Sequence, residues 1–401
     1  MADGIRNRTF LGVSWLAAAV VAGCSAPVPE RSGATASPPA SRVEPARTQP
    51  PGGELLDSER LGQTLQALSA NDRVTVERIG TSAGGRPIWM AIVTAPGADL
   101  KALRRRARDI SGPDVAYDRV SSARVRTRDV ATALAEARLP VLVAGASWGH
   151  EAAQVEGLVG AIETLANDRS PDIERALRRT VALIVPLVNP DGRDRAVAEW
   201  KTTPRSNGES AVGNASGLML NRDFVHQTQP ESAAMLRVIR DWRPVVGIDE
   251  HEDVNRLGVA MEETAFVPPY MTGFDVEETS DGRQAITRVG DAIAKRWKAA
   301  GYPIVHDAAG DTKWVPMPPR GSGELNPVAG SSGRLEFLFN VHGIVGLITE
   351  SARTPGTQTW QARVDQKRLA ALAAIDAVAA DPAYVATTVY ERRLKATTDA
   401  A

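Results

Sequence analysis

Short apolar runs alternate with segments of helical periodicity through most of the chain. The runs are short enough to be strands, and the segments between them repeat apolar residues at helical spacing. Strands that read as nearly continuous apolar runs are buried on both faces of a sheet. We therefore expect an α/β fold whose central sheet is covered by helices on both faces. The expected strands are VTVERIG (74–80), IWMAIVTA (88–95), LPVLVAGA (139–146), VALIVPLV (181–188), VVGIDE (245–250), RLEFLFN (334–340) and GIVGLITE (343–350).

Helices are expected between and after these strands. The amphipathic pattern predicts them at 61–70, near 130–137, from 151 onward, at 230–242, at 283–301 and at 358–380. In an open α/β sheet, functional side chains gather in the loops at the carboxyl ends of the strands. The polar residues that follow each apolar run are thus the first candidates for a site.

The N-terminal 53 residues differ in composition from the rest. A short basic start and the apolar stretch 10–22 predict a signal peptide over residues 1–23, since the stretch is too short to span a membrane. The following VAGC resembles a bacterial lipobox, which implies a lipid anchor at Cys24. Residues 24–53 are rich in Pro, Ala and Ser and predict a disordered tether. We expect a single folded domain over 54–390 and a tail over 391–401.

Charge and cysteine content exclude several functions. The formal net charge is −1 in 401 residues, which argues against a nucleic-acid partner. The basic run KALRRRARD, residues 101–109, is interpreted as a solvated helix face or loop. Cys24 is the one cysteine, so an intrachain disulfide and a cysteine-based zinc site are both excluded.

Two strand ends carry residues that bind metals. The run LPVLVAGA leads into SWGHE, so His150 and Glu151 stand between a strand and a helix, and His251 closes the run VVGIDEH. A hydrolytic zinc site uses about three His, Asp or Glu ligands and one open position for water. A carboxylate next to His251 would fix the tautomer of its imidazole.

Six segments, in order, resemble the zinc metallocarboxypeptidase family, the carboxypeptidase A-like fold. They are GTSAGGRPI (80–88), GASWGHEAAQVEG (145–157), VPLVNPDGRDR (185–195), LNRDF (220–224), IDEHE (248–252) and GLITES (346–351). The resemblance implies a central mixed, largely parallel twisted sheet with helices on both faces. It also implies peptide hydrolysis at the C-terminus by water that one zinc ion activates. We interpret the NPDG turn as structural.

The resemblance assigns roles residue by residue. Glu350 is the expected catalytic general base, and Glu151 and His251 are expected zinc ligands. Asn221 and Arg222 are expected to hold the terminal carboxylate of the substrate. Arg205, ahead of Arg195 and Lys201, is the expected oxyanion-stabilising cation. Tyr270 and Tyr302 are candidates for the substrate-clamping tyrosine.

The first zinc segment departs from the family pattern. Trp148 stands where the family has a histidine, and an indole cannot ligate zinc. Either His150 replaces that ligand or zinc binding is weakened or lost, and we favour replacement. The alternative function is a catalytically silent domain that binds peptides or cell-wall fragments. A serine hydrolase is disfavoured because Ser147 and Ser351 lie in no G-x-S-x-G elbow.

The predicted anchor sets the expected location and substrates. We expect a lipid-anchored protein of the bacterial cell envelope, at the outer membrane or facing the periplasm if the cell is Gram-negative. Peptides, or the peptides of peptidoglycan, are then the expected substrates, and the membrane is the expected partner through Cys24.

Overall fold

The computed structural model describes residues 55–110, 137–203, 208–253, 280–302, 333–352 and 359–398. The chain divides into two units, Met1–Glu44 and Pro45–Ala401, and all described residues belong to the second. The predicted signal peptide and tether, and the helix expected near 130–137 apart from Ala137, lie outside the described residues. So do the long segments 254–279 and 303–332.

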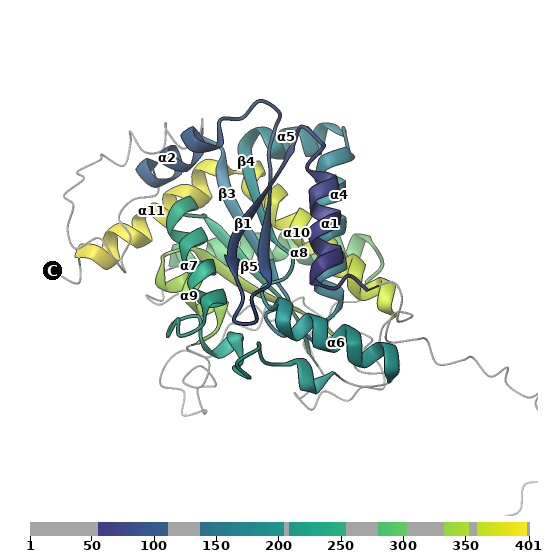
Figure 1. Ribbon diagram of the computed structural model, residues 1–401. Coiled ribbons are helices and arrows are strands. Elements are labelled where there is room, and N and C mark those ends of the chain that lie inside the picture. The colour runs from purple at the N-terminus through teal and green to yellow at the C-terminus, as the bar shows by residue number, and fades with distance from the viewer. Residues whose placement is uncertain are drawn as a thin grey trace, which may run out of the picture. The chain divides into compact units, whose positions relative to one another are not determined.

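Six strands form one mixed sheet in the order β1-β2-β4-β3-β5-β6. The strands are β1 (Val74–Thr81), β2 (Pro87–Val93), β3 (Leu139–Gly145), β4 (Thr180–Val185), β5 (Val246–Asp253) and β6 (Val345–Ala352). β1 and β2 form an antiparallel hairpin that pairs antiparallel with β4, whereas β4, β3, β5 and β6 are parallel. The predicted mixed, largely parallel sheet is confirmed, and Figure 1 shows its twist.

Helices cover both faces of this sheet (Figure 1). One face packs against α1 (Ser58–Leu68), α4 (Ala153–Asn167), α5 (Pro171–Arg179), α8 (Ser280–Ala299), α10 (Trp360–Ala380) and α11 (Pro382–Thr398). The other packs against α2 (Leu100–Ile110), α7 (Pro230–Trp242) and α9 (Leu335–Val341). Alternate residues of each strand serve the two cores: Val143 faces α4 and α10, whereas Leu142 faces α7 and α9.

Two sequence predictions need correction. RLEFLFN, expected to be a strand, forms helix α9, because Leu335, Leu338 and Phe339 recur at helical spacing and are all buried. The NPDG segment is no isolated turn. Asn189 caps α6 (Pro190–Thr202), its side chain accepting from the N–H of Gly192 at 2.9 Å.

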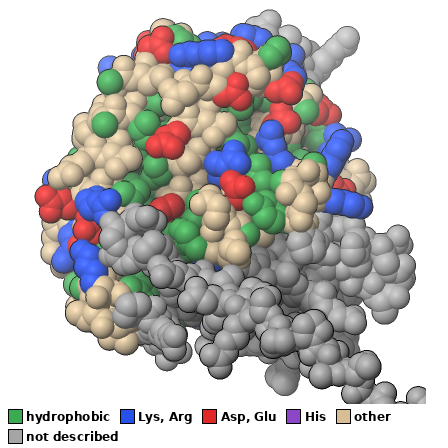
Figure 2. Space-filling model, turned by 90° about the vertical axis from the view of Figure 1, so that its right-hand side faces the viewer, with side chains coloured by type: hydrophobic (Ala, Val, Ile, Leu, Met, Phe, Trp, Pro, Cys, Tyr) green, Lys and Arg blue, Asp and Glu red, His purple; other side chains and the backbone are tan. Residues whose placement is uncertain are grey.

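Two further helices were not predicted, and the basic run has a defined secondary structure. Helices α5 and α11 were not predicted, and α11 continues through most of the segment 391–401 that was assigned to a tail. The basic run 101–109 lies within α2, where Arg104 pairs with Glu77 and stacks on Trp242. The face shown in Figure 2 carries acidic and basic side chains interspersed among its described residues.

No helix of the described residues is by itself long and apolar enough to span a membrane. Helix α10 and residues Pro382–Leu394 of α11 meet that criterion only together, across a bend of 91°.

Candidate active site

The loop after β3 carries the first pair of predicted residues, His150 and Glu151. Ala146 adopts a left-handed conformation, with φ of 54°, and turns the chain away from the sheet. A Cβ on Gly149 would lie 2.1 Å from the backbone of Gly192, so only glycine fits where this loop crosses the start of α6. Glu151 precedes α4 by two residues instead of lying in its first turn, as was expected.

Glu151 is held by two hydrogen-bond donors and an imidazole nitrogen although it is buried. Its Oε2 accepts from Nε2 of Gln154 at 2.6 Å and from the backbone N–H of Glu252 at 3.1 Å. Nδ1 of His251 lies 3.0 Å from the same oxygen. This carboxylate is thus fixed in position between the start of α4 and the end of β5.

His251 is buried between two carboxylates. Asp249 lies 3.0 Å from Nε2, on the ring edge opposite Glu151, and the amide nitrogen of Asn221 lies 3.3 Å from Nε2. Burial opposes a charge on the ring, but Asp249 and Glu151 outweigh it and raise the pKa of His251 well above its usual range. A metal ion would have to displace the Nδ1 proton that this shift retains. In the resulting neutral ring, Nε2 donates to Asp249 and Nδ1 presents a lone pair beside Glu151, as in a carboxylate–histidine–metal arrangement.

Oε2 of Glu151 and Nδ1 of His251 could supply two of the ligands that a zinc ion requires. A buried carboxylate oxygen and an imidazole nitrogen converge, and a carboxylate orients the imidazole. The part of the chain that the structure describes contains no group of three metal-ligating side chains. His150 is buried, and its ring centroid lies 5.7 Å from that of Trp148. Its role as third ligand stays a prediction.

The face of the strand opposite His251 carries a buried ionic cluster. Glu250 and Glu252 point toward α10, because side chains alternate along β5. Nζ of Lys367 lies 3.2 Å from Glu250 and also donates to the carbonyl of His251, and Arg363 pairs with Glu252. All four side chains are at most 2% exposed.

Glu350 and His251 are neighbours across β5 and β6. They are register partners in the parallel ladder, so their side chains leave the same face of the sheet. Glu350 is half-buried. The predicted general base is therefore adjacent to a predicted ligand at the carboxyl edge of the sheet.

Asn221 and Arg222 lie in the short 3-10 helix Leu220–Arg222 on the α9 side of the sheet. Asn221 contacts His251 through its amide, and the guanidinium carbon of Arg222 lies 5.7 Å from the ring centroid of Trp148. The structure thus brings Asn221 and Arg222 to the neighbourhood of His251 and Trp148. Burial, followed by the charge of Arg334, lowers the pKa of Arg222.

Of the other predicted residues, the structure describes Arg195, Lys201 and Tyr302. Arg195 and Tyr302 form hydrogen bonds to residues outside this cluster. Arg205 and Tyr270 lie outside the described residues. Arg195 donates to the backbone carbonyls of Gly213 and Asn214, and Lys201 is exposed at the end of α6. The hydroxyl of Tyr302 donates to Asp365 on α10 at 2.8 Å, which together with burial raises its pKa to about 12.

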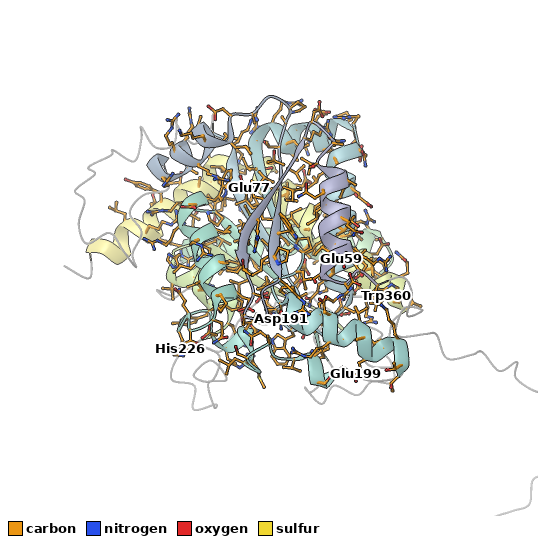
Figure 3. The ribbon with its side chains drawn as sticks, viewed as in Figure 1. Glu59, Glu77, Asp191, Glu199, His226 and Trp360 are labelled. Atoms are coloured by element: carbon orange, nitrogen blue, oxygen red, sulfur yellow. The ribbon has the colours of Figure 1, made fainter. Side chains whose placement is uncertain are left out.

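The NPDG segment joins the start of α6 to the β1–β2 hairpin. Asp191 accepts from Ser82, the N–H of Gly84 and Arg86 at the tip of the β1–β2 hairpin, and from the N–H of Ala215. Figure 3 shows Asp191 at the start of α6 and His226 at the surface, away from it. The structural interpretation of this segment agrees with these contacts.

The chain is similar to a known protein family in sequence and to solved structures in fold. The zinc carboxypeptidase family model, Peptidase_M14, matches residues 61–324. No curated protein matches the sequence significantly.

Solved structures share the fold at low identity. A metallo-carboxypeptidase from Burkholderia cenocepacia has a TM-score of 0.54 and 16% identity over 82% of this chain and 71% of its own. A metallo-carboxypeptidase from Pseudomonas aeruginosa, solved with (2-guanidinoethylmercapto)succinic acid, has a TM-score of 0.54 and 17% identity over 83% and 71%. Carboxypeptidase A from Helicoverpa armigera has a TM-score of 0.52 and 16% identity over 85% and 78%.

The family match spans well over half of the chain, and the sheet order and the strand-end residues are in keeping with it. The chain belongs to the zinc carboxypeptidase family, whose members are metal-dependent peptide hydrolases.

Proposed function

We propose that this protein is a zinc-dependent metallocarboxypeptidase that hydrolyses the C-terminal peptide bond of its substrates. The observation that carries the proposal is the contact of 3.0 Å between Nδ1 of His251 and Oε2 of Glu151, with Glu350 in register beside His251. In this proposal Glu151, His251 and His150 hold one zinc ion. Bound there, zinc would supply Lewis-acid chemistry, activating water at neutral pH and polarising a carbonyl.

Glu350 acts as the general base. Its position in β6, in register with His251 of β5, brings a carboxylate beside His251. It takes a proton from the attacking water and delivers it to the leaving amine, so that one group serves both transfers. The side chain of Glu350 is half-buried, so part of it is accessible to water and substrate.

Asn221 and Arg222 hold the terminal carboxylate of the substrate. A guanidinium offers a planar pair of donors that matches a carboxylate, and an amide adds a further donor. Trp148 lies against Arg222 and supports its orientation in place of a metal ligand. Arg205 is the proposed cation for the developing oxyanion.

The proposed setting is the bacterial cell envelope. The lipobox-like VAGC supports a lipid anchor at Cys24, and the Pro-, Ala- and Ser-rich composition of residues 24–53 supports their role as a tether between that anchor and the domain. Peptides, or the peptides of peptidoglycan, are the substrates that this setting offers.

The test compares the wild-type protein with Glu350→Gln. We expect wild-type protein loaded with zinc to release C-terminal amino acids from blocked dipeptides. Glu350→Gln should bind zinc and peptide but lose hydrolysis by roughly a hundredfold or more. Full activity of Glu350→Gln would reject the base, and zinc and peptide binding by a wild-type protein that hydrolyses nothing would favour the silent peptide-binding domain.

A further inference from the structure

A second segment packs directly on the one that carries Asn221 and Arg222. The N–H of Phe224 donates to the carbonyl of Gly333 at 2.9 Å, and the N–H of Leu335 donates to Oδ1 of Asn221 at 3.4 Å. A Cβ on Gly333 would lie 2.0 Å from the carbonyl oxygen of Arg222. The two backbone segments are in contact, so the side chains of Arg334 and Arg222 leave neighbouring positions of the main chain.

Arg334 and Arg222 are close enough to affect each other electrostatically. Burial is the largest cause that lowers the pKa of Arg222, and the charge of Arg334 is the next. Both side chains are half-buried and therefore remain accessible to a ligand. Two guanidinium groups of like charge at one site repel each other unless an anion lies between or beside them.

The described residues compensate this positive charge only in part. The acidic partner of Arg334 is Glu336, at 3.5 Å, and Nε of Arg334 is buried without a hydrogen-bond partner among the described residues. Burial and the nearby Asp249 raise the pKa of Glu336 to about 7, so its negative charge is incomplete at neutral pH. Arg222 makes no ion pair with a described residue; it donates to the carbonyl of Asn221.

We propose that this site selects substrates whose C-terminal residue carries a second carboxylate, such as glutamate or aspartate. This inference rests on the proposed function. Arg222 holds the main-chain carboxylate, and Arg334, one segment away on the same side, holds the carboxylate of the side chain. The dianion supplies the counter-charge that the two arginines lack.

Other side chains fit this environment less well. A C-terminal lysine or arginine would bring a third positive charge to a pair that already repels itself. An apolar side chain would desolvate the guanidinium of Arg334 without pairing it, which is costly for a charged group. An amide oxygen could accept a hydrogen bond from it but would supply no negative charge. The selectivity should therefore distinguish glutamate from glutamine, which have the same shape and differ in charge.

The experiment measures kcat/KM for blocked Ala-Glu, Ala-Gln, Ala-Leu and Ala-Lys dipeptides with the zinc-loaded full chain. We expect Ala-Glu to exceed Ala-Gln by roughly tenfold to a hundredfold, the range of a charge-assisted hydrogen bond. Arg334→Gln should remove that difference by lowering kcat/KM for Ala-Glu toward the value for Ala-Gln. Arg334→Glu should prefer Ala-Lys. Equal rates for Ala-Glu and Ala-Gln in the wild type, or a preference for Ala-Leu, would overturn the proposal.

Controls separate this inference from the proposed function. Arg288→Gln makes the same substitution at an exposed arginine of α8 that pairs with Asp381, and it should keep the preference for Ala-Glu. Arg334→Lys keeps the positive charge and should retain part of the preference for Ala-Glu. This milder variant keeps the proposal testable if Arg334→Gln does not fold. Calorimetric binding of Ala-Glu and Ala-Gln to Glu350→Gln measures selectivity without turnover. If wild type hydrolyses no dipeptide, the proposed function fails; if it hydrolyses them without charge preference, only this inference fails.

Discussion

Nδ1 of His251 lies 3.0 Å from Oε2 of Glu151, although the two residues are 100 positions apart in the chain. The contact joins the carboxyl end of β5 to the loop that follows β3, its neighbour in the sheet. Because both side chains are buried and each has further polar partners, the pair is held before any metal binds. Such preorganisation is what a metal site requires of its ligands.

Arg363 is predicted to stabilise the fold and the metal site together. It pairs with Glu252, whose Oε2 accepts from the N–H of Ala153 at 3.0 Å and whose own N–H donates to Glu151. Arg363→Met leaves a buried carboxylate unpaired, which should cost about 3–5 kcal/mol of unfolding free energy. It should also weaken zinc binding, because Glu151 loses a fixed donor. Urea unfolding and competition with a chromophoric chelator measure the two effects.

Arg73→Met is the matched control for that prediction. Arg73 is also a buried arginine, pairing with Glu174 far along the sheet from β5, so its loss should lower stability and leave zinc affinity unchanged. If Arg363→Met and Arg73→Met lower the free energy of unfolding equally and neither changes zinc affinity, the pair of Arg363 with Glu252 stabilises the fold and has no role in zinc binding.

Ionisation of Glu336 is predicted to lower the free energy of unfolding as the pH rises. Burial raises the pKa of this carboxyl from 4.5 to about 7, so ionisation is disfavoured in the folded protein. The contribution of the protonated Glu336 carboxyl to the free energy of unfolding is then fully present below pH 4.5. It decreases by about 3 kcal/mol as the pH rises toward 7. Glu336→Gln should therefore be more stable than wild type at pH 8 and similar at pH 5, as chemical denaturation at both values would show. A Glu336→Gln variant that is less stable than wild type at pH 8 would contradict this.

Gly333→Ala is predicted to impair substrate binding through the backbone of Arg222. The added Cβ would meet the carbonyl carbon of Arg222 at 2.2 Å, so the segment must move. We expect KM to rise by roughly tenfold or more with a smaller change in kcat, since the loss is in binding of the substrate. Gly160→Ala, on the surface of α4 where a Cβ meets only the flexible side chain of Arg368, should leave KM unchanged. An unaltered KM in Gly333→Ala would remove Arg222 from the substrate site.

His150 is predicted to be the third zinc ligand. It is buried two residues after Trp148, and His150→Ala should lower zinc affinity by roughly a hundredfold. His226→Ala, which removes an exposed histidine before α7, serves as the control and should bind zinc as wild type does. Equal zinc affinity of both variants would exclude His150 and require a ligand from another part of the chain.

The sequence was sufficient to predict the strands that build the site. Continuous apolar runs marked β3, β4, β5 and β6, and polar residues at their ends marked Glu151 and His251. The same rule failed at α9, because a run of seven apolar and polar residues fits a strand as well as two helical turns. Burial of Leu335, Leu338 and Phe339 on one face decided for the helix.

The partners behind the site could not be predicted from local patterns. Lys367 contacts the carbonyl of His251 across 116 positions, and only the fold places α10 behind β5. One signal was available: Arg363, Gln366 and Lys367 recur at helical spacing in a helix that is otherwise rich in alanine, and all three are buried. Charged residues on a buried helix face indicate buried partners of opposite charge, here Glu250 and Glu252.

The zinc content of the purified protein and of His251→Ala, after dialysis against a weak chelator, tests the proposed metal site most directly. We expect one zinc per chain in the wild type and none retained in His251→Ala, with the fold of both confirmed by circular dichroism. A folded wild-type protein that binds no zinc, or a His251→Ala variant that keeps its full zinc content, would contradict it.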